Sequence, residues 1–151
     1  MGNVTPKLII IIGLPGSGKF CYLEDLCKKR EVQYIYDDFH ANAFNDSRKV
    51  VGSQHFCALI SHLKNGEDCA ISDVAFCKNT RLKEVIDETM KEAKDVKKIE
   101  LIYFKNEPEN CIQNIKARNR KSSDKEINLV GELTGAYKIP DGAKQVPVFK
   151  K

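Results

Sequence analysis

Residues 8–20 read Leu8-Ile9-Ile10-Ile11-Ile12-Gly13-Leu14-Pro15-Gly16-Ser17-Gly18-Lys19-Phe20. Five aliphatic residues in a row, four of them isoleucine, predict a strand that is buried on both faces of a parallel sheet. Apolar residues at helical spacing follow at Leu23, Leu26 and Cys27, which predicts a helix over 21–30. A glycine-rich loop between a strand and a helix can turn its backbone N–H groups toward an anion, and the helix N-terminus adds positive charge.

This loop matches the phosphate-binding P-loop pattern G-x-x-x-x-G-K-[S/T] at every position except the last. We therefore predict that it holds the phosphates of a nucleotide and that Lys19 reaches the β- and γ-phosphates of ATP. The exception is Phe20, which stands where a Ser or Thr hydroxyl normally holds Mg²⁺. Because a phenyl ring cannot ligate a metal ion, the sequence leaves Mg²⁺ binding and catalysis open. The predicted nucleotide-binding residues are Gly13, Leu14, Pro15, Gly16, Ser17, Gly18, Lys19 and Phe20.

The composition is that of one ordinary globular domain. The 25 basic and 21 acidic residues give a formal charge of +4, a mild bias that is compatible with an anionic ligand. Six cysteines show no C-x-x-C spacing, and several fall in apolar segments, so we interpret them as core residues in a reducing compartment. The apolar run near the N-terminus is too short to cross a bilayer. We therefore expect a cytoplasmic protein without a membrane partner.

The rest of the chain alternates between strand-like and helix-like segments. Further strands are predicted at 32–36, 69–72, 99–104 and 146–149. Helices are predicted at 46–64 and 78–93, and another begins near Glu107. A last helix begins at Ser123, because Ser123-Asp124-Lys125-Glu126 has the spacing of a capping box. Pro147 places the last strand at an edge of the sheet. Residues 1–151 are therefore expected to form one α/β domain of three layers, α/β/α, in which the middle layer is a five-stranded, mostly parallel sheet.

Acidic residues follow two of the predicted strands. Asp37 and Asp38 come directly after the second strand, where residues of an open α/β sheet face the ligand crevice. One of them could accept a proton from a hydroxyl group or hold hydrated Mg²⁺, while the other caps the next helix. Asp73 ends the third strand, where it could orient water around Mg²⁺ or contact the acceptor substrate. Aspartates at strand ends are also common without any such role.

The predicted helix that begins near Glu107 ends in a basic segment, Lys116-Ala117-Arg118-Asn119-Arg120-Lys121. Arg118 lies on the same helix face as Asn114, and such a cluster could neutralise charge on a triphosphate. Cations also accumulate at helix C-termini because they interact favourably with the helix dipole. We favour the functional interpretation, with Arg118 rather than Arg120 as the phosphate ligand.

In this order the motifs resemble those of the small P-loop kinases, and among them the polynucleotide-kinase-like group related to phage 5′-hydroxyl kinases. The resemblance rests on residues 13–19 (GLPGSGK), Asp37-Asp38-Phe39, Ile71-Ser72-Asp73 and the segment around Arg118, which together span most of the chain. It implies a P-loop NTPase fold with the P-loop strand central in a five-stranded parallel sheet. It also implies that ATP is the phosphate donor.

The same resemblance implies roles for individual residues. Asp37 corresponds to the base that contacts the acceptor hydroxyl, Asp73 to the aspartate that binds substrate or orders Mg²⁺, and Arg118 to a lid arginine on the ATP phosphates. Lys19, Asp37 and Arg118 are therefore the expected catalytic residues. The expected substrate-binding residues are Asp37, Asp38 and Asp73, of which Asp37 and Asp73 would hold Mg²⁺ indirectly, through water.

The chain departs from that family beyond Phe20. Tyr36 and His40 stand where the phage enzymes place arginines around their aspartates, and Asn114 takes the place of the first lid arginine. Even the loss of a supporting residue commonly lowers metal affinity about 10–100-fold, so replacing a direct ligand should cost at least as much.

The leading hypothesis is a phosphotransferase that moves the γ-phosphate of ATP to a hydroxyl group on a nucleic-acid end, a nucleoside or a small alcohol. The alternative is a nucleotide-binding module that holds ATP or ADP without efficient Mg²⁺-dependent transfer. A third hypothesis is nucleic-acid binding through residues 116–121, which no recognised motif supports. The acceptor and the oligomeric state are left open.

Overall fold

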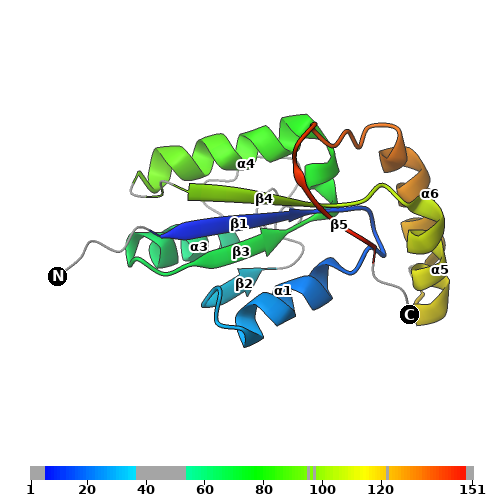
Figure 1. The fold of residues 1–151 in the computed structure, drawn as a ribbon, viewed down its shortest axis with the longest axis horizontal. Coiled ribbons are helices and arrows are strands. Elements are labelled where there is room, and N and C mark those ends of the chain that lie inside the picture. Colours follow the sequence, from blue (N-terminus) through cyan, green and yellow to red (C-terminus); the bar gives the residue numbers. More distant parts are fainter. Residues whose placement is uncertain (1–5, 37–53, 95, 97, 122, 149–151) are drawn as a thin grey trace.

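The computed structural model describes residues 6–36, 54–94, 96, 98–121 and 123–148. Its centre is a five-stranded, all-parallel sheet in the order β2-β3-β1-β4-β5 (Figure 1). The strands are β1 (Lys7–Ile12), β2 (Tyr34–Tyr36), β3 (Cys69–Ser72), β4 (Lys98–Phe104) and β5 (Lys144–Val146). The described helices are α1 (Lys19–Lys28), α3 (Gln54–Lys64), α4 (Asn79–Glu92), α5 (Pro108–Arg118) and α6 (Ser123–Thr134), with a short 3₁₀ helix, η2, at Val74–Cys77.

The central strand β1 separates two hydrophobic cores. Its side chains alternate between the faces of the sheet, so that Leu8, Ile10 and Ile12 join the larger core and Ile9 and Ile11 join the smaller one. Each of the five is at most 3% exposed. This double burial explains why the strand is apolar at every position instead of every second one.

The helices cover both faces of the sheet (Figure 1). Leu23 and Leu26 of α1 pack into the smaller core, whereas Leu59 of α3 and Leu82 and Val85 of α4 pack into the larger one. The result is the predicted three-layer α/β/α arrangement. The helices α5 and α6 pack against each other at the carboxyl end of the sheet, beside the turn that follows β1.

The structure corrects two predicted boundaries and leaves part of a third prediction untested. The last strand lies at Lys144–Val146, not at 146–149, because Pro147 has no N–H to continue the ladder; its edge position is confirmed. The second strand, predicted at 32–36, is shortened to Tyr34–Tyr36, although Val32 is buried. The helix predicted at 46–64 is described from Gln54 onward, and its first residues lie outside the described ranges.

The cysteine prediction holds for three of the six residues. Cys69, Cys77 and Cys111 are buried, while Cys21 and Cys57 are exposed and the sixth is intermediate; all are free thiols. In the described part of the chain, no helix is both long enough and apolar enough to span a membrane.

Candidate functional site

The candidate site begins with the loop that follows β1. Its backbone has positive φ angles at Gly16 (81°) and Gly18 (101°), and residues that carry a side chain rarely adopt this conformation. A hydrogen bond from the N–H of Ser17 to the carbonyl of Leu14 (3.1 Å) closes the turn. The loop then enters α1 directly at Lys19, so its amides and the helix N-terminus face the same space. This is the backbone arrangement that a phosphate-binding loop requires.

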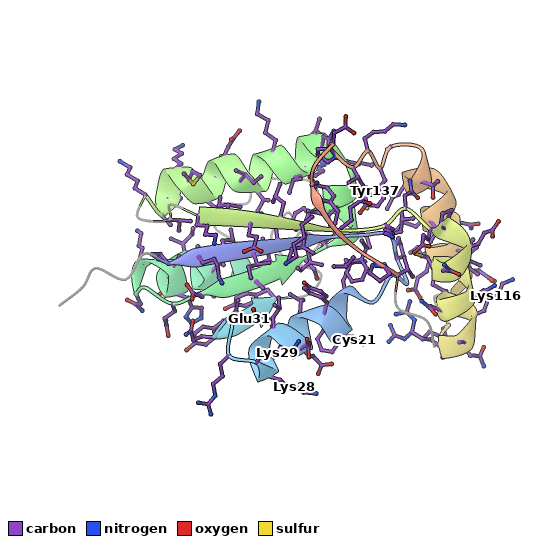
Figure 2. The ribbon with its side chains drawn as sticks, in the orientation of Figure 1. Cys21, Lys28, Lys29, Glu31, Lys116 and Tyr137 are labelled. Atoms are coloured by element: carbon purple, nitrogen blue, oxygen red, sulfur yellow. The ribbon has the colours of Figure 1, made fainter. Side chains whose placement is uncertain are left out.

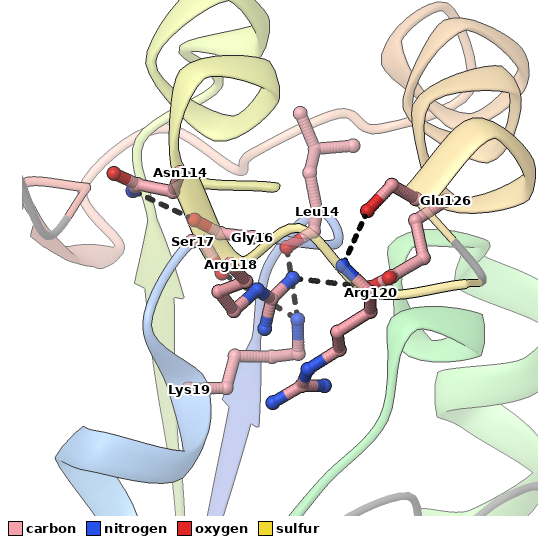
Figure 3. Close-up of polar contacts among 9 residues, drawn as sticks. Leu14, Gly16, Ser17, Lys19, Asn114, Arg118, Arg120 and Glu126 are labelled. Carbon is pink, nitrogen blue, oxygen red and sulfur yellow. Dashed lines mark hydrogen bonds and ion pairs between the residues drawn. The ribbon is translucent and has the colours of Figure 1, made fainter. Parts of the chain in front are cut away.

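Lys19 lies with its ammonium group inside the curve of the loop. Its side chain is 7% exposed, and Nζ donates to the carbonyl of Leu14 (2.9 Å) and to Oγ of Ser17 (3.5 Å; Figure 3). The charge of Lys19 acts on two buried thiols, those of Cys77 and Cys111. Burial raises the pKa of Cys77 to about 12 and that of Cys111 to about 11, although the charge of Lys19 acts to lower both. The thiols therefore stay protonated, and the lysine supplies positive charge to the loop.

The loop, the start of α1 and the two helices at the carboxyl end of the sheet enclose one cavity of about 340 Å³. In Figure 3 the ammonium of Lys19 and the guanidinium of Arg118 lie close together in this view, whereas the side chain of Arg120 extends away from them. The cavity is lined by Pro15, Gly16, Gly18, Lys19, Phe20, Cys21, Val74, Arg118, Arg120 and Glu126. The lining thus combines a glycine loop, three cations and one carboxylate.

Gly16 of the loop is hydrogen-bonded to α5. Nδ2 of Asn114 donates to the carbonyl of Gly16 (2.9 Å), and Asn114 is only 8% exposed. The backbone of Gly16 also approaches α5 so closely that a Cβ at this position would lie 2.5 Å from the carbonyl oxygen of Cys111. Asn114 therefore fixes the loop against α5, which is a structural role at the position of a lid arginine.

A second contact ties α5 to α6. Nη2 of Arg118 lies 3.0 Å from Oε2 of Glu126, and the two side chains are 26% and 23% exposed (Figure 3). The capping-box spacing correctly predicts a helix start at Ser123, but Glu126 directs its carboxylate to Arg118. Oγ of Ser123 accepts a hydrogen bond from the N–H of Arg120 (3.0 Å), which holds the turn between the helices. The guanidinium of Arg118 is thereby oriented at the rim of the cavity.

The predicted acidic residues have different outcomes. Asp37 and Asp38 lie outside the described residues. Asp73 is 3% exposed and lies beside the loop, because Ser72 pairs with Ile11 of β1 in the parallel ladder. Its Oδ1 accepts a hydrogen bond from the N–H of Ala75 (2.8 Å) and so caps η2. Asp73 is therefore a helix cap next to the cavity, and a further role toward substrate or Mg²⁺ stays a prediction.

The structure adds residues that the sequence did not single out. Arg120 lines the cavity together with Arg118, so position does not distinguish the two, and the preference for Arg118 stays a prediction. Cys21 and Val74 also line it, and their places follow from the loop and from the end of β3. Glu126 had only a capping signal in the sequence. Its contact with Arg118 depends on how α5 and α6 pack, which no local pattern encodes.

The residues of this site fit the phosphate chain of a nucleotide better than they fit Mg²⁺. Phe20 offers no ligand, and its side chain is 49% exposed at the cavity. Within the described ranges, no group of three or more His, Cys, Asp or Glu side chains could hold a metal ion. Among the described side chains, a directly bound Mg²⁺ therefore finds neither a hydroxyl at position 20 nor a cluster of three ligands.

Comparison with known proteins gives one sequence relative and a shared fold. The chain is 30% identical over 141 residues to the uncharacterized protein R277 of Acanthamoeba polyphaga mimivirus, and the match covers 91% of each chain. No protein-family model matches the chain.

Solved structures share the fold at low sequence identity. A gluconokinase from Sinorhizobium meliloti matches with a TM-score of 0.61 and 15% identity, over 99% of this chain and 86% of that chain. A chain of the Pnkp1/Rnl/Hen1 RNA repair complex matches with a TM-score of 0.52 and 20% identity, over 95% of this chain and 50% of that chain. The chain therefore shares the fold of these proteins, the α/β fold of the P-loop kinases.

Proposed function

The chain belongs to the same family as the mimivirus protein R277 and has the fold of the P-loop kinases, and from this premise we propose that it is an ATP-dependent phosphotransferase. The reaction would move the γ-phosphate of ATP to the hydroxyl group of an acceptor. One observation carries the proposal: the loop after β1, Lys19, Arg118 and Arg120 all face a single cavity of about 340 Å³.

The loop and the cationic side chains would bind different parts of the ATP phosphate chain. Backbone N–H groups of the loop after β1 would hold the phosphate oxygens, and the ammonium of Lys19 would neutralise charge between the β- and γ-phosphates. The guanidinium of Arg118 would contact the transferring group, where charge develops. Glu126 supports this role because it holds Arg118 at the cavity at 3.0 Å.

The acceptor would bind beside the end of β2. Asp37 would orient the acceptor hydroxyl and take its proton, with Asp38 and Asp73 as further substrate contacts. The acceptor oxygen would then form a bond to the γ-phosphorus while the bond to ADP breaks. The fold neighbours act in different chemical settings, a gluconokinase and an RNA repair complex, so both polyol and nucleic-acid hydroxyls are candidate acceptors.

A transfer assay tests the proposal. ATP labelled in its γ-phosphate would be incubated with the protein and with one acceptor from each class: a 5′-hydroxyl oligonucleotide, a nucleoside and gluconate. We expect label to reach one class, and Lys19→Met or Asp37→Asn to reduce the rate about 10²–10⁴-fold. Absence of transfer to every class, under conditions where the protein binds ATP, would refute the phosphotransferase proposal.

A further inference from the structure

We propose that the P-loop cavity binds a nucleoside triphosphate without Mg²⁺, with Lys19, Arg118 and Arg120 supplying the positive charge that the metal ion supplies in other P-loop proteins. The inference rests on the proposed function, because it concerns the form in which the same site takes its nucleotide.

The first step of the argument is the side chain at the metal position. The residue after the P-loop lysine normally gives Mg²⁺ a hydroxyl ligand. Here that residue is Phe20, whose side chain is 49% exposed and lines the cavity. Because a phenyl ring has no lone pair and occupies part of the wall, it both removes the ligand and places apolar surface there.

The second step is that neighbouring oxygen atoms already have partners. Oγ of Ser17 is buried inside the loop and lies 3.5 Å from Nζ of Lys19. Oδ1 of Asp73 accepts a hydrogen bond from η2, and Oε2 of Glu126 is bound to Arg118. These contacts direct the oxygen atoms toward protein partners, and a hydrated Mg²⁺ would have to compete with them, so we take none of these side chains as a replacement for the missing hydroxyl.

The third step is the convergence of cations. Lys19, Arg118 and Arg120 line the same cavity, where Glu126 is the one acidic residue of the lining (Figure 3). Like charges that face one cavity repel each other, and a polyanion between them removes that repulsion. Arginine is suited to this task because its planar guanidinium donates two parallel hydrogen bonds to phosphate.

The positions of the two arginines also fit the task. Arg118 ends α5 and Arg120 follows it in the turn to α6, so both side chains reach the cavity from the α5–α6 pair, whereas Lys19 and Phe20 reach it from the start of α1. The guanidinium of Arg118 is held by Glu126, and the turn is held by the bond between Arg120 and Ser123. The positive charge is thus built into a fixed helix pair, independent of any ion.

Isothermal titration calorimetry with ATP tests this inference, first in excess Mg²⁺ and then in excess EDTA. We expect the two dissociation constants to agree within about threefold. Arg120→Gln should weaken binding in EDTA about tenfold, the effect of one charge-assisted hydrogen bond, and the double variant Arg118→Gln/Arg120→Gln about a hundredfold. Lys116→Gln is the matched control, because Lys116 is exposed on the outer side of α5 (Figure 2) and does not line the cavity; it should change affinity less than twofold.

The outcomes separate the inference from the proposed function. Binding that weakens more than tenfold in EDTA would overturn the inference and leave the phosphotransferase proposal standing. Absence of ATP binding in both buffers would overturn both. Arg120→Gln and Lys116→Gln variants with equal affinities would also overturn the inference, because the cavity-lining charge would then do no more than a remote one. Phe20→Ser should gain affinity in Mg²⁺ relative to EDTA, and equal affinities for that variant would contradict the role given to Phe20.

Discussion

Replacing Gly16 with alanine should destabilise the protein more than the same change at Gly142. The two glycines have nearly equal positive φ angles, 81° and 79°, so alanine pays the same backbone strain of about 1–2 kcal/mol at either position. Their surroundings differ. A Cβ at Gly16 would lie 2.5 Å from the carbonyl oxygen of Cys111 and 2.8 Å from Cγ1 of Ile115, whereas nothing lies within 4 Å of a Cβ at Gly142.

The difference between the two variants isolates the packing of the loop on α5. Overpacking against a backbone atom costs about 1–3 kcal/mol. Gly16→Ala should therefore lower the free energy of unfolding by about 2–5 kcal/mol and Gly142→Ala by about 1–2 kcal/mol. The loop would also have to move away from α5, which would stretch the 2.9 Å hydrogen bond from Asn114.

Urea unfolding followed by far-UV circular dichroism measures these values, since the chain has no tryptophan to report by fluorescence. Gly131→Ala calibrates the series, because a Cβ in α6 meets nothing within 4 Å and should stabilise the protein by about 0.5–1 kcal/mol. Equal losses for Gly16→Ala and Gly142→Ala, with unchanged m-values, would refute the close packing of the loop on α5.

Three other perturbations test the site and its support. Glu126→Gln keeps an amide oxygen that can accept a hydrogen bond from Arg118 but removes the negative charge from the cavity, so it should tighten ATP binding about twofold to fivefold. Glu84→Gln, where the pairing with an arginine lies on α4 instead, should leave the affinity unchanged in the same titration. Tyr137→Phe removes a hydroxyl that donates to the backbone carbonyls of Ile12 in β1 and Phe104 in β4 (Tyr137 is labelled in Figure 2). It should lower the free energy of unfolding in urea by about 1–3 kcal/mol. Folding raises the pKa of Cys77 and Cys111 above their ordinary value of 9.0, so the native state holds more protons above pH 9 and stability should fall there by up to about 1.4 kcal/mol per pH unit for each thiol. Urea midpoints between about pH 8 and pH 10.5 check this, and an unchanged slope in Cys77→Ala would contradict it.

The fold was predictable because its signals are local and repeated. The isoleucine run of β1 predicts double burial, and the step from that strand through glycines to Lys19 predicts both the loop and α1. Each further strand and helix has its own pattern of apolar residues in the sequence, and the alternation of strands with helices indicates a parallel sheet. The boundary errors fall where tertiary packing decides: β5 begins at Lys144 because this residue pairs with Ile102 of β4, and it ends at Val146, before Pro147.

The candidate site was predictable only in part. The residues of the loop and Arg118 have sequence signals, a motif and a basic helix end, and the cavity brings them together. The contact between Arg118 and Glu126 and the bond between Asn114 and Gly16 join segments that only the packed helix pair brings close. The sequence distance between Asn114 and Gly16 is 98 residues, which no helical or strand period spans.

The most direct test of the account locates bound ATP in the loop after β1. The chain contains nine glycines, so a sample labelled with ¹⁵N-glycine gives a ¹H–¹⁵N spectrum of at most nine backbone signals. On addition of ATP, the signals of Gly13, Gly16 and Gly18 should move, and Lys19→Met should abolish the change. Gly66 precedes β3 at the opposite end of the parallel sheet, and its signal should stay in place. Shifts at Gly66 without shifts at the three loop glycines would contradict the claim that this loop holds the phosphate chain.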